Sequence, residues 1–187
     1  MTDLVTKADY KAYKGINSSN DDAKLDALIP MVSKLVQTYC GKSFVEYATT
    51  NYTETFSLKW YQQVVFLKET PVIEIVSVQE LISAGTYDTL TTDEYLLDTE
   101  MDAVYRVSDG EATDYPIGIN AVKVTYKGGY TEIPADLQLA VFDLITYYLK
   151  EQYLPEKNHA SFTIRYNPDS PGFPTHIGRI LDQYKNV

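Results

Sequence analysis

Residues 21–41 have the sequence DDAKLDALIPMVSKLVQTYCG, and residues 133–149 have the sequence IPADLQLAVFDLITYYL. In both segments the apolar residues recur at three- and four-residue intervals, which is the spacing of a helix with one apolar face. Because each apolar face needs a partner, we predict that the two helices pack together in a small helical bundle. The predicted core residues are Leu25, Leu28, Ile29, Val32, Leu35, Val36, Tyr39, Leu137, Ala140, Val141, Leu144, Ile145 and Tyr148.

Capping residues and prolines mark where the helices begin and end. Thr6 is the predicted N-cap of a short helix over residues 7–13, and Gly41 ends the helix that follows. Pro134 occupies the first turn of the last long helix, where its missing N–H does least harm. Pro30 lies inside a helical segment, so we expect either a kink or a boundary between two helical pieces.

Between residues 44 and 130 the apolar pattern changes to a period of two, which is typical of strands. Turn dipeptides such as Asp109-Gly110 and Gly128-Gly129 separate these segments. We therefore predict an α+β fold, in which an antiparallel sheet or small sandwich is inserted into a helical protein. The predicted strands are 52–56, 64–67, 73–78, 95–97, 103–107 and 122–126. The predicted parts of the chain are 1–43, 44–132, 133–154 and 155–187.

The last part of the chain is rich in proline, with four between residues 155 and 174. It is nevertheless too apolar for a solvated tail. We expect an extended arm, ending in a short amphipathic helix, that is held by other protein subunits rather than by its own fold. The candidate contact residues are Phe162, Ile164, Tyr166, Phe173, Ile177, Ile180, Leu181 and Tyr184.

The composition indicates a soluble globular protein. The chain has 187 residues, 44% of them hydrophobic, which is enough for one sizeable core with or without a smaller second domain. No stretch approaches the roughly 20 apolar residues of a membrane span, and the N-terminus lacks the pattern of a signal peptide. The single cysteine, Cys40, excludes an intrachain disulfide and, being on an apolar helix face, predicts a buried packing role.

The charge and the tyrosine content point to protein partners. A formal net charge of −10 opposes tight binding to the phosphate backbone of nucleic acids. It is compatible with DNA that slides past without binding. The 17 tyrosines suit both strand faces and protein interfaces.

We find no catalytic motif in the sequence. His159 and His176 lack the spacing of a zinc protease. Asp98, Glu100 and Asp102 alternate, so within one strand they would share a face and could bind a hard cation or act as paired carboxylates. Alternating acids are also typical of the solvated face of an edge strand. We predict a protein without cofactor or metal, with these three acids as the weaker, alternative cation site.

Several short motifs carry a family resemblance. They are YCGKSF at residues 39–44, TPVIEI at 70–75, VKVTYKGGY at 122–130, IPADL at 133–137 and ILDQYK at 180–185. In this order, over nearly the full length, the chain resembles the small head-tail connector (adaptor or head completion) proteins of tailed bacteriophages. The motifs define helix ends, strands and turns, so the resemblance concerns a fold and a structural role and not a reaction.

The resemblance implies a virion protein, assembled in the host cytoplasm, that forms a ring, usually of twelve copies in this family, beneath the portal at the capsid vertex. Its partners would be the portal protein, copies of itself, and further neck or tail proteins. DNA would pass through the channel without sequence-specific binding, and no membrane is involved. A head-closure or tail-end neck protein is the nearest alternative. A small cation-dependent enzyme and a monomeric binding module are alternatives from other classes.

Overall fold

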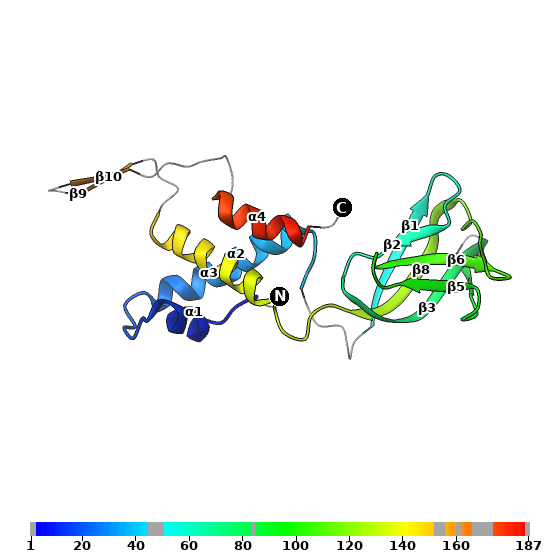
Figure 1. Ribbon diagram of the computed structural model, residues 1–187, viewed down its shortest axis with the longest axis horizontal. Helices are drawn as coiled ribbons and strands as arrows, with labels where there is room; N and C mark the ends of the chain where they lie inside the picture. Colours follow the sequence, from blue (N-terminus) through cyan, green and yellow to red (C-terminus); the bar gives the residue numbers. More distant parts are fainter. Residues whose placement is uncertain are drawn as a thin grey trace. The chain divides into compact units, whose positions relative to one another are not determined.

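The α+β class is confirmed by the computed structural model (Figure 1), which describes residues 3–44, 51–83, 85–151, 156–159, 162–165 and 174–185. The chain divides into two compact units. Residues 1–43 and 133–187 form the helical unit, and residues 44–132 form the β unit.

The first helix of the helical unit, α1 (Lys7–Lys14), begins as predicted at Thr6. The Thr6 Oγ1 accepts a hydrogen bond from the Asp9 N–H, and the Asp9 carboxylate accepts one from the Thr6 N–H, which completes a capping box. Gly15 ends the helix in the left-handed conformation with φ of 66°.

The second helix, α2 (Asp22–Cys40), runs without interruption through Pro30. The alternative of two helical pieces is therefore wrong. The Pro30 ring faces solvent, and the tertiary packing of the helix on either side outweighs the lost backbone hydrogen bond. Gly41 ends α2 with φ of 73°, as its sequence position predicts.

Helices α2 and α3 (Ala135–Leu149) contact each other, and α4 (Thr175–Gln183) contacts both. The prediction of one shared core is confirmed for the residues at its centre, whose side chains are buried. They are Leu25, Ile29, Val32, Val36, Leu137, Ala140, Val141, Leu144 and Ile145. Leu28, Tyr39 and Tyr148 are partly buried at its margin.

The prediction that Leu35 belongs to this core is wrong, because its side chain is 37% exposed. The polar residue Ser33 is buried instead, and its Oγ accepts a hydrogen bond of 3.0 Å from the Leu4 N–H. The segment before α1 packs on this side of α2, since Leu4 and Val5 are also buried. Apolar periodicity does not detect a buried serine that binds a distant backbone group, so it assigned Leu35 to the buried face in place of Ser33.

The β unit contains two antiparallel sheets. One has the strand order β1-β8-β3-β4 and the other the order β2-β6-β5, with the short strand β7 paired to β6. The strands of the first sheet are β1 (Tyr52–Leu58), β8 (Gly118–Gly128), β3 (Val72–Ser83) and β4 (Thr86–Thr89). Those of the second are β2 (Val64–Phe66), β6 (Ala103–Ser108), β5 (Tyr95–Asp98) and β7 (Glu111–Ala112). The six predicted strands are all present, while β4 and β7 are additional.

Both sheets contribute to one apolar core, which includes Val78 and Val124 from the first sheet and Val65 and Val104 from the second. Where β3 and β6 approach, Arg106 Nε donates a 2.9 Å hydrogen bond to Glu80 Oε1, and both side chains are mostly buried. Burial raises the pKa of Glu80, whereas the Arg106 charge and hydrogen bond act in the opposite direction. A short sequence pattern could not have paired these two distant residues.

The motif at residues 122–130 has a structural explanation within this unit. The buried Tyr126 hydroxyl accepts a hydrogen bond from the Glu69 N–H and donates one to Glu54. Gly128 is needed for space, because a Cβ there would lie 2.8 Å from the Glu69 carbonyl oxygen and 2.9 Å from that of Pro71. The motif therefore holds the segment before β3 against the end of β8.

The expected irregular arm contains a β-hairpin that the sequence analysis missed. Strands β9 (Glu156–His159) and β10 (Phe162–Arg165) pair antiparallel, with His159 opposite Phe162. Proline content dominated the sequence-based interpretation, but none of the four prolines falls within either strand. The short helix predicted at the end of the arm is present as α4.

The shared helical core predicts that Leu144→Ala lowers the free energy of unfolding by about 2–4 kcal/mol, through lost apolar burial and a residual cavity. Leu139→Ala on the exposed side of the same helix is the control and should cost less than about 1 kcal/mol. Chemical denaturation of both variants measures the difference, and equal losses would contradict the packing of α3.

Helix α4 provides a second stability test. Leu181→Ala should lower the free energy of unfolding by about 2–4 kcal/mol because Leu181 is fully buried. Gln183→Ala, on an exposed position of α4, should change it by less than about 0.5 kcal/mol. If Leu181→Ala unfolds at the same denaturant concentration as the unchanged protein, α4 does not belong to the core.

Candidate functional site

The closing helix packs on its own subunit, which corrects the expectation for Ile177 and Leu181 as contacts for another subunit. Both side chains are buried. The Cys40 thiol donates a hydrogen bond to the Leu181 carbonyl oxygen at 3.6 Å, and burial raises the pKa of Cys40 to about 11. Two tyrosines complete the attachment: the Tyr39 hydroxyl donates to Asp182, and the Tyr184 hydroxyl donates to Asp136, each at 2.6 Å.

The helical unit has a third helix with an apolar face, α4, and that face packs on α2 and α3. The pair of long helices offers more apolar surface than α1 covers, and α4 occupies the remainder.

The other contact candidates have different positions. Phe162 and Ile164 belong to β10, whereas Tyr166 and Phe173 lie outside the described residues. Ile180 is partly exposed on α4.

The three alternating acids do not lie on one strand, so the geometry of the alternative cation site is wrong. Asp98 ends β5, and its Oδ1 accepts hydrogen bonds from the N–H groups of Glu100 and Met101. Asp102 has φ of 49°, and its Oδ1 accepts a 2.8 Å hydrogen bond from the Val72 N–H. These carboxylates shape a turn and join it to the other sheet. Within the described residues, no cluster of three or more His, Cys, Asp or Glu is arranged to hold a metal ion.

The outer side of α2 carries an apolar stripe formed by Ala27, Met31 and Leu35, which follow one another at four-residue intervals. All three are exposed, Met31 by 66%. Lys24 and Lys34 flank this stripe on the same side of the helix. The α2 stripe is therefore a candidate contact surface on the helical unit.

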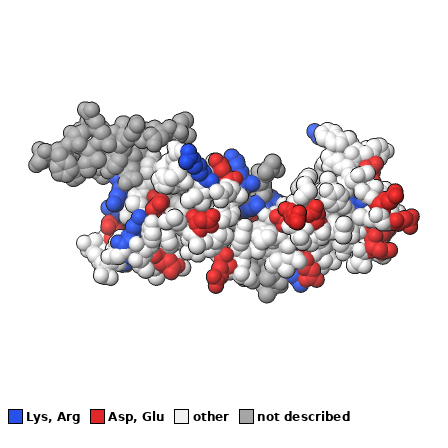
Figure 2. Space-filling model, viewed as in Figure 1, with Lys and Arg blue, Asp and Glu red and all other residues white. Residues whose placement is uncertain are grey.

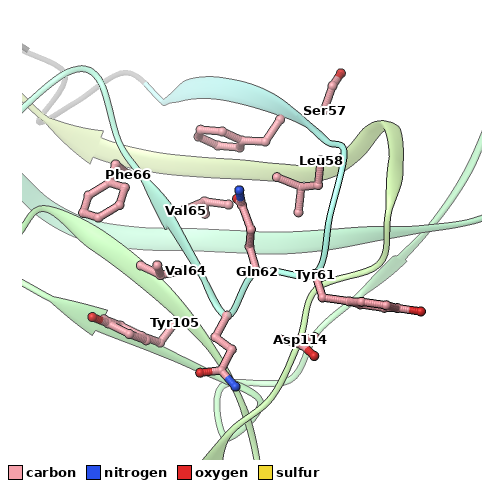
Figure 3. Close-up of a pocket in the computed structure, with 11 residues that line it drawn as sticks. Ser57, Leu58, Tyr61, Gln62, Val64, Val65, Phe66, Tyr105 and Asp114 are labelled. Atoms are coloured by element: carbon pink, nitrogen blue, oxygen red, sulfur yellow. The ribbon is translucent and has the colours of Figure 1, made fainter. Parts of the chain in front are cut away.

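The β unit carries an open groove of about 760 Å³ between the edge strands of its two sheets (Figure 3). The end of β1 forms one wall and β2 forms the other. Tyr61 and Gln62 come from the connection between these strands, and Asp114 lies at the same end of the groove. The lining combines apolar and aromatic side chains with Ser57, Gln62 and Gln63, and Asp114 is its one charged residue.

The two units differ sharply in charge. Residues 44–132 contain 15 acidic and 5 basic residues, whereas the rest of the chain contains 11 of each. The formal net charge of −10 therefore resides in the β unit, and the helical unit is neutral. Figure 2 shows acidic side chains gathered over the part of the molecule that Figure 1 labels β5 and β6, while lysine and arginine are frequent over the helices.

Helices that span membranes are long and strongly apolar, and no helix in the described part of this chain meets both conditions.

The hydrogen bond between the Asp102 carboxylate and the Val72 N–H can be tested by substitution. Asp102→Ala should lower the free energy of unfolding by about 1–3 kcal/mol, because the Val72 N–H loses its acceptor. Glu100→Gln, on an exposed side chain of the same turn, should change it by less than about 0.5 kcal/mol. Millimolar Ca²⁺ should leave the unfolding midpoint unchanged. A Ca²⁺-dependent rise in the midpoint that Asp102→Ala abolishes would restore the cation site.

Comparisons with known proteins show the family and the fold of this chain. The head completion protein of Escherichia phage T5 is 24% identical over 187 residues, covering 98% of this chain and 99% of that protein. The same fold occurs in the neck of an empty gene transfer agent particle computed with C6 symmetry, with a TM-score of 0.61, 15% identity, and coverage of 98% and 90%. It also occurs in the neck of a native particle computed with C12 symmetry, with a TM-score of 0.56, 15% identity, and coverage of 100% and 96%. The model of the family described as "Head completion protein" matches residues 3–187, and the chain belongs to that family.

Proposed function

We propose that this chain is a structural head-tail connector subunit in the neck of a tailed phage. It forms a ring below the portal, extends the DNA channel and docks the next neck or tail component. The observation that carries the proposal is the family match over residues 3–187, which includes both units. The shared fold with chains from gene transfer agent necks supports it.

The neutral helical unit is the better candidate for contacts between neighbouring copies. In a closed ring each copy uses two different surfaces, one toward each neighbour. Copies of a unit with balanced charge approach without net repulsion, whereas copies of the β unit repel one another. The α2 stripe, with Met31 at its centre, supplies an exposed apolar surface for one of these contacts.

DNA contacts in this proposal are weak and independent of sequence. The excess of acidic residues opposes the phosphate backbone and the counterion release that drives tight DNA binding. A channel wall with more Asp and Glu than Lys and Arg lets DNA move during packaging and ejection. A wall lined mainly by Lys and Arg in a particle structure would contradict this part of the proposal.

The ring is tested by mixing the purified chain with purified portal rings. We expect a larger particle in size-exclusion chromatography, and a second ring stacked on the portal in electron microscopy. Met31→Glu should reduce ring formation at least about tenfold, since it places a charge in an apolar contact. Gln183→Glu adds the same charge at another exposed position of the helical unit and is the control.

A chain that stays monomeric beside portal rings would contradict the proposed function and favour a monomeric binding module. Normal rings with Met31→Glu would contradict only the use of the α2 stripe. Circular dichroism of both variants establishes that the helices are intact before the comparison is made.

A further inference from the structure

The second sheet of the β unit has one face in the core and one face in solvent. In the strand register, Val65 lies opposite Val104, and Val104 lies opposite Leu97. These residues belong to the unit's core or pack against it. Their neighbours along each strand point to the other face, because side chains alternate along a strand. Val64, Tyr105 and Leu96 are thus aligned across the three strands on the outer face.

This outer face is apolar and unusually open. Phe66 is 55% exposed and Leu96 is 62% exposed. Met101, in the turn after β5, is 51% exposed, and its sulfur accepts a weak hydrogen bond from the Tyr105 hydroxyl at 4.0 Å. We call the set of Val64, Phe66, Leu96, Met101 and Tyr105 the β face.

The β face continues into the groove described above. Three of its members, Val64, Phe66 and Tyr105, also line the groove, as Figure 3 shows. A partner that covers the face can therefore insert a side chain between the edges of β1 and β2. Exposed aromatic groups beside a concave site are typical of the residues that dominate binding energy at protein interfaces.

Three acidic groups lie beside this apolar centre. Asp98 follows Leu96 on the same side of β5, Glu100 is exposed next to Met101, and Asp114 lines the groove. With 15 acidic and 5 basic residues, the whole β unit presents a negative potential to an approaching protein. An apolar centre with an acidic margin is complementary to apolar side chains surrounded by Lys and Arg.

We propose that the β face docks a different protein of the particle, whose contact surface presents apolar side chains within a rim of Lys and Arg. A second copy of the β unit is disfavoured because both units carry the same large charge. This inference rests on the proposed function and assigns the outward docking step to the β unit, while ring contacts use the helical unit.

The test uses phage that lacks the gene and receives variants from a plasmid. Phe66→Glu combined with Leu96→Glu places two charges in the β face at positions too exposed to disturb the core. Ile82→Glu combined with Ile119→Glu adds the same charge at exposed positions of the same unit outside the face and is the control. Infectious titre and the protein content of purified heads are measured for each.

We expect heads with the β-face variant to contain this chain in normal amount but to lack one further virion protein. The titre should fall at least about tenfold, and the control should keep its titre. An unchanged titre would overturn the proposal. Loss of the variant chain from heads would also overturn it, since the face would then serve the ring or the portal. Absence of the unchanged chain from wild-type heads would instead refute the proposed function itself.

The acidic residues beside the β face are tested with the protein that is missing from the variant heads. Its binding to purified wild-type heads should weaken as the salt concentration rises, because surface charges are screened. Glu100→Gln combined with Asp114→Asn should weaken binding at low salt and flatten this dependence. Binding that is insensitive to both salt and these substitutions would exclude a basic rim on the partner.

Discussion

The mutual burial of helices α2 and α3 is the constraint on which the rest of the structure depends. The two helices come from opposite ends of the chain, and their buried side chains form one core. Neither apolar face would be stable in water alone, so burial provides the main favourable free energy of the helical unit. Residues 44–132 are therefore an insertion in the helical unit: the chain leaves that unit after α2 and returns to it before α3. An insertion of this kind can acquire surfaces of its own without changing the helical core.

Charge separates the roles of the two units. The helical unit pairs its charges internally, for example Lys11 with Asp22 at 2.7 Å and Lys14 with Asp143 at 3.5 Å. These surface pairs contribute little stability. The unit is neutral because its acidic and basic residues are equal in number, and this balance favours packing of repeated copies. The β unit keeps its unbalanced carboxylates, and repetition around a ring would multiply their potential. Such a ring would attract basic partners and oppose DNA phosphates at the same time.

The motifs that resemble the head completion family proved to be structural in this chain. Gly41 ends α2, and Gly128 allows the close approach of the backbone around Glu69 and Pro71. The last motif belongs to α4, where Leu181 is buried and Tyr184 binds Asp136. The residues of these motifs therefore close the two units, while the exposed β face and the α2 stripe lie outside all five motifs.

The sequence by itself determined the α+β class, the two long helices, most strands and the acidic character, because periodicity, capping residues and composition act over short stretches of chain. It also indicated a structural role through family resemblance. Tertiary structure alone decided that Ser33 is buried and Leu35 exposed, since the choice depends on the distant Leu4 N–H. It likewise placed α4 in its own subunit, drew Asp98 and Asp102 into a turn, and aligned the β face. A helix or strand pattern specifies that an apolar face will be covered, but which segment covers it depends on contacts between residues far apart in the chain.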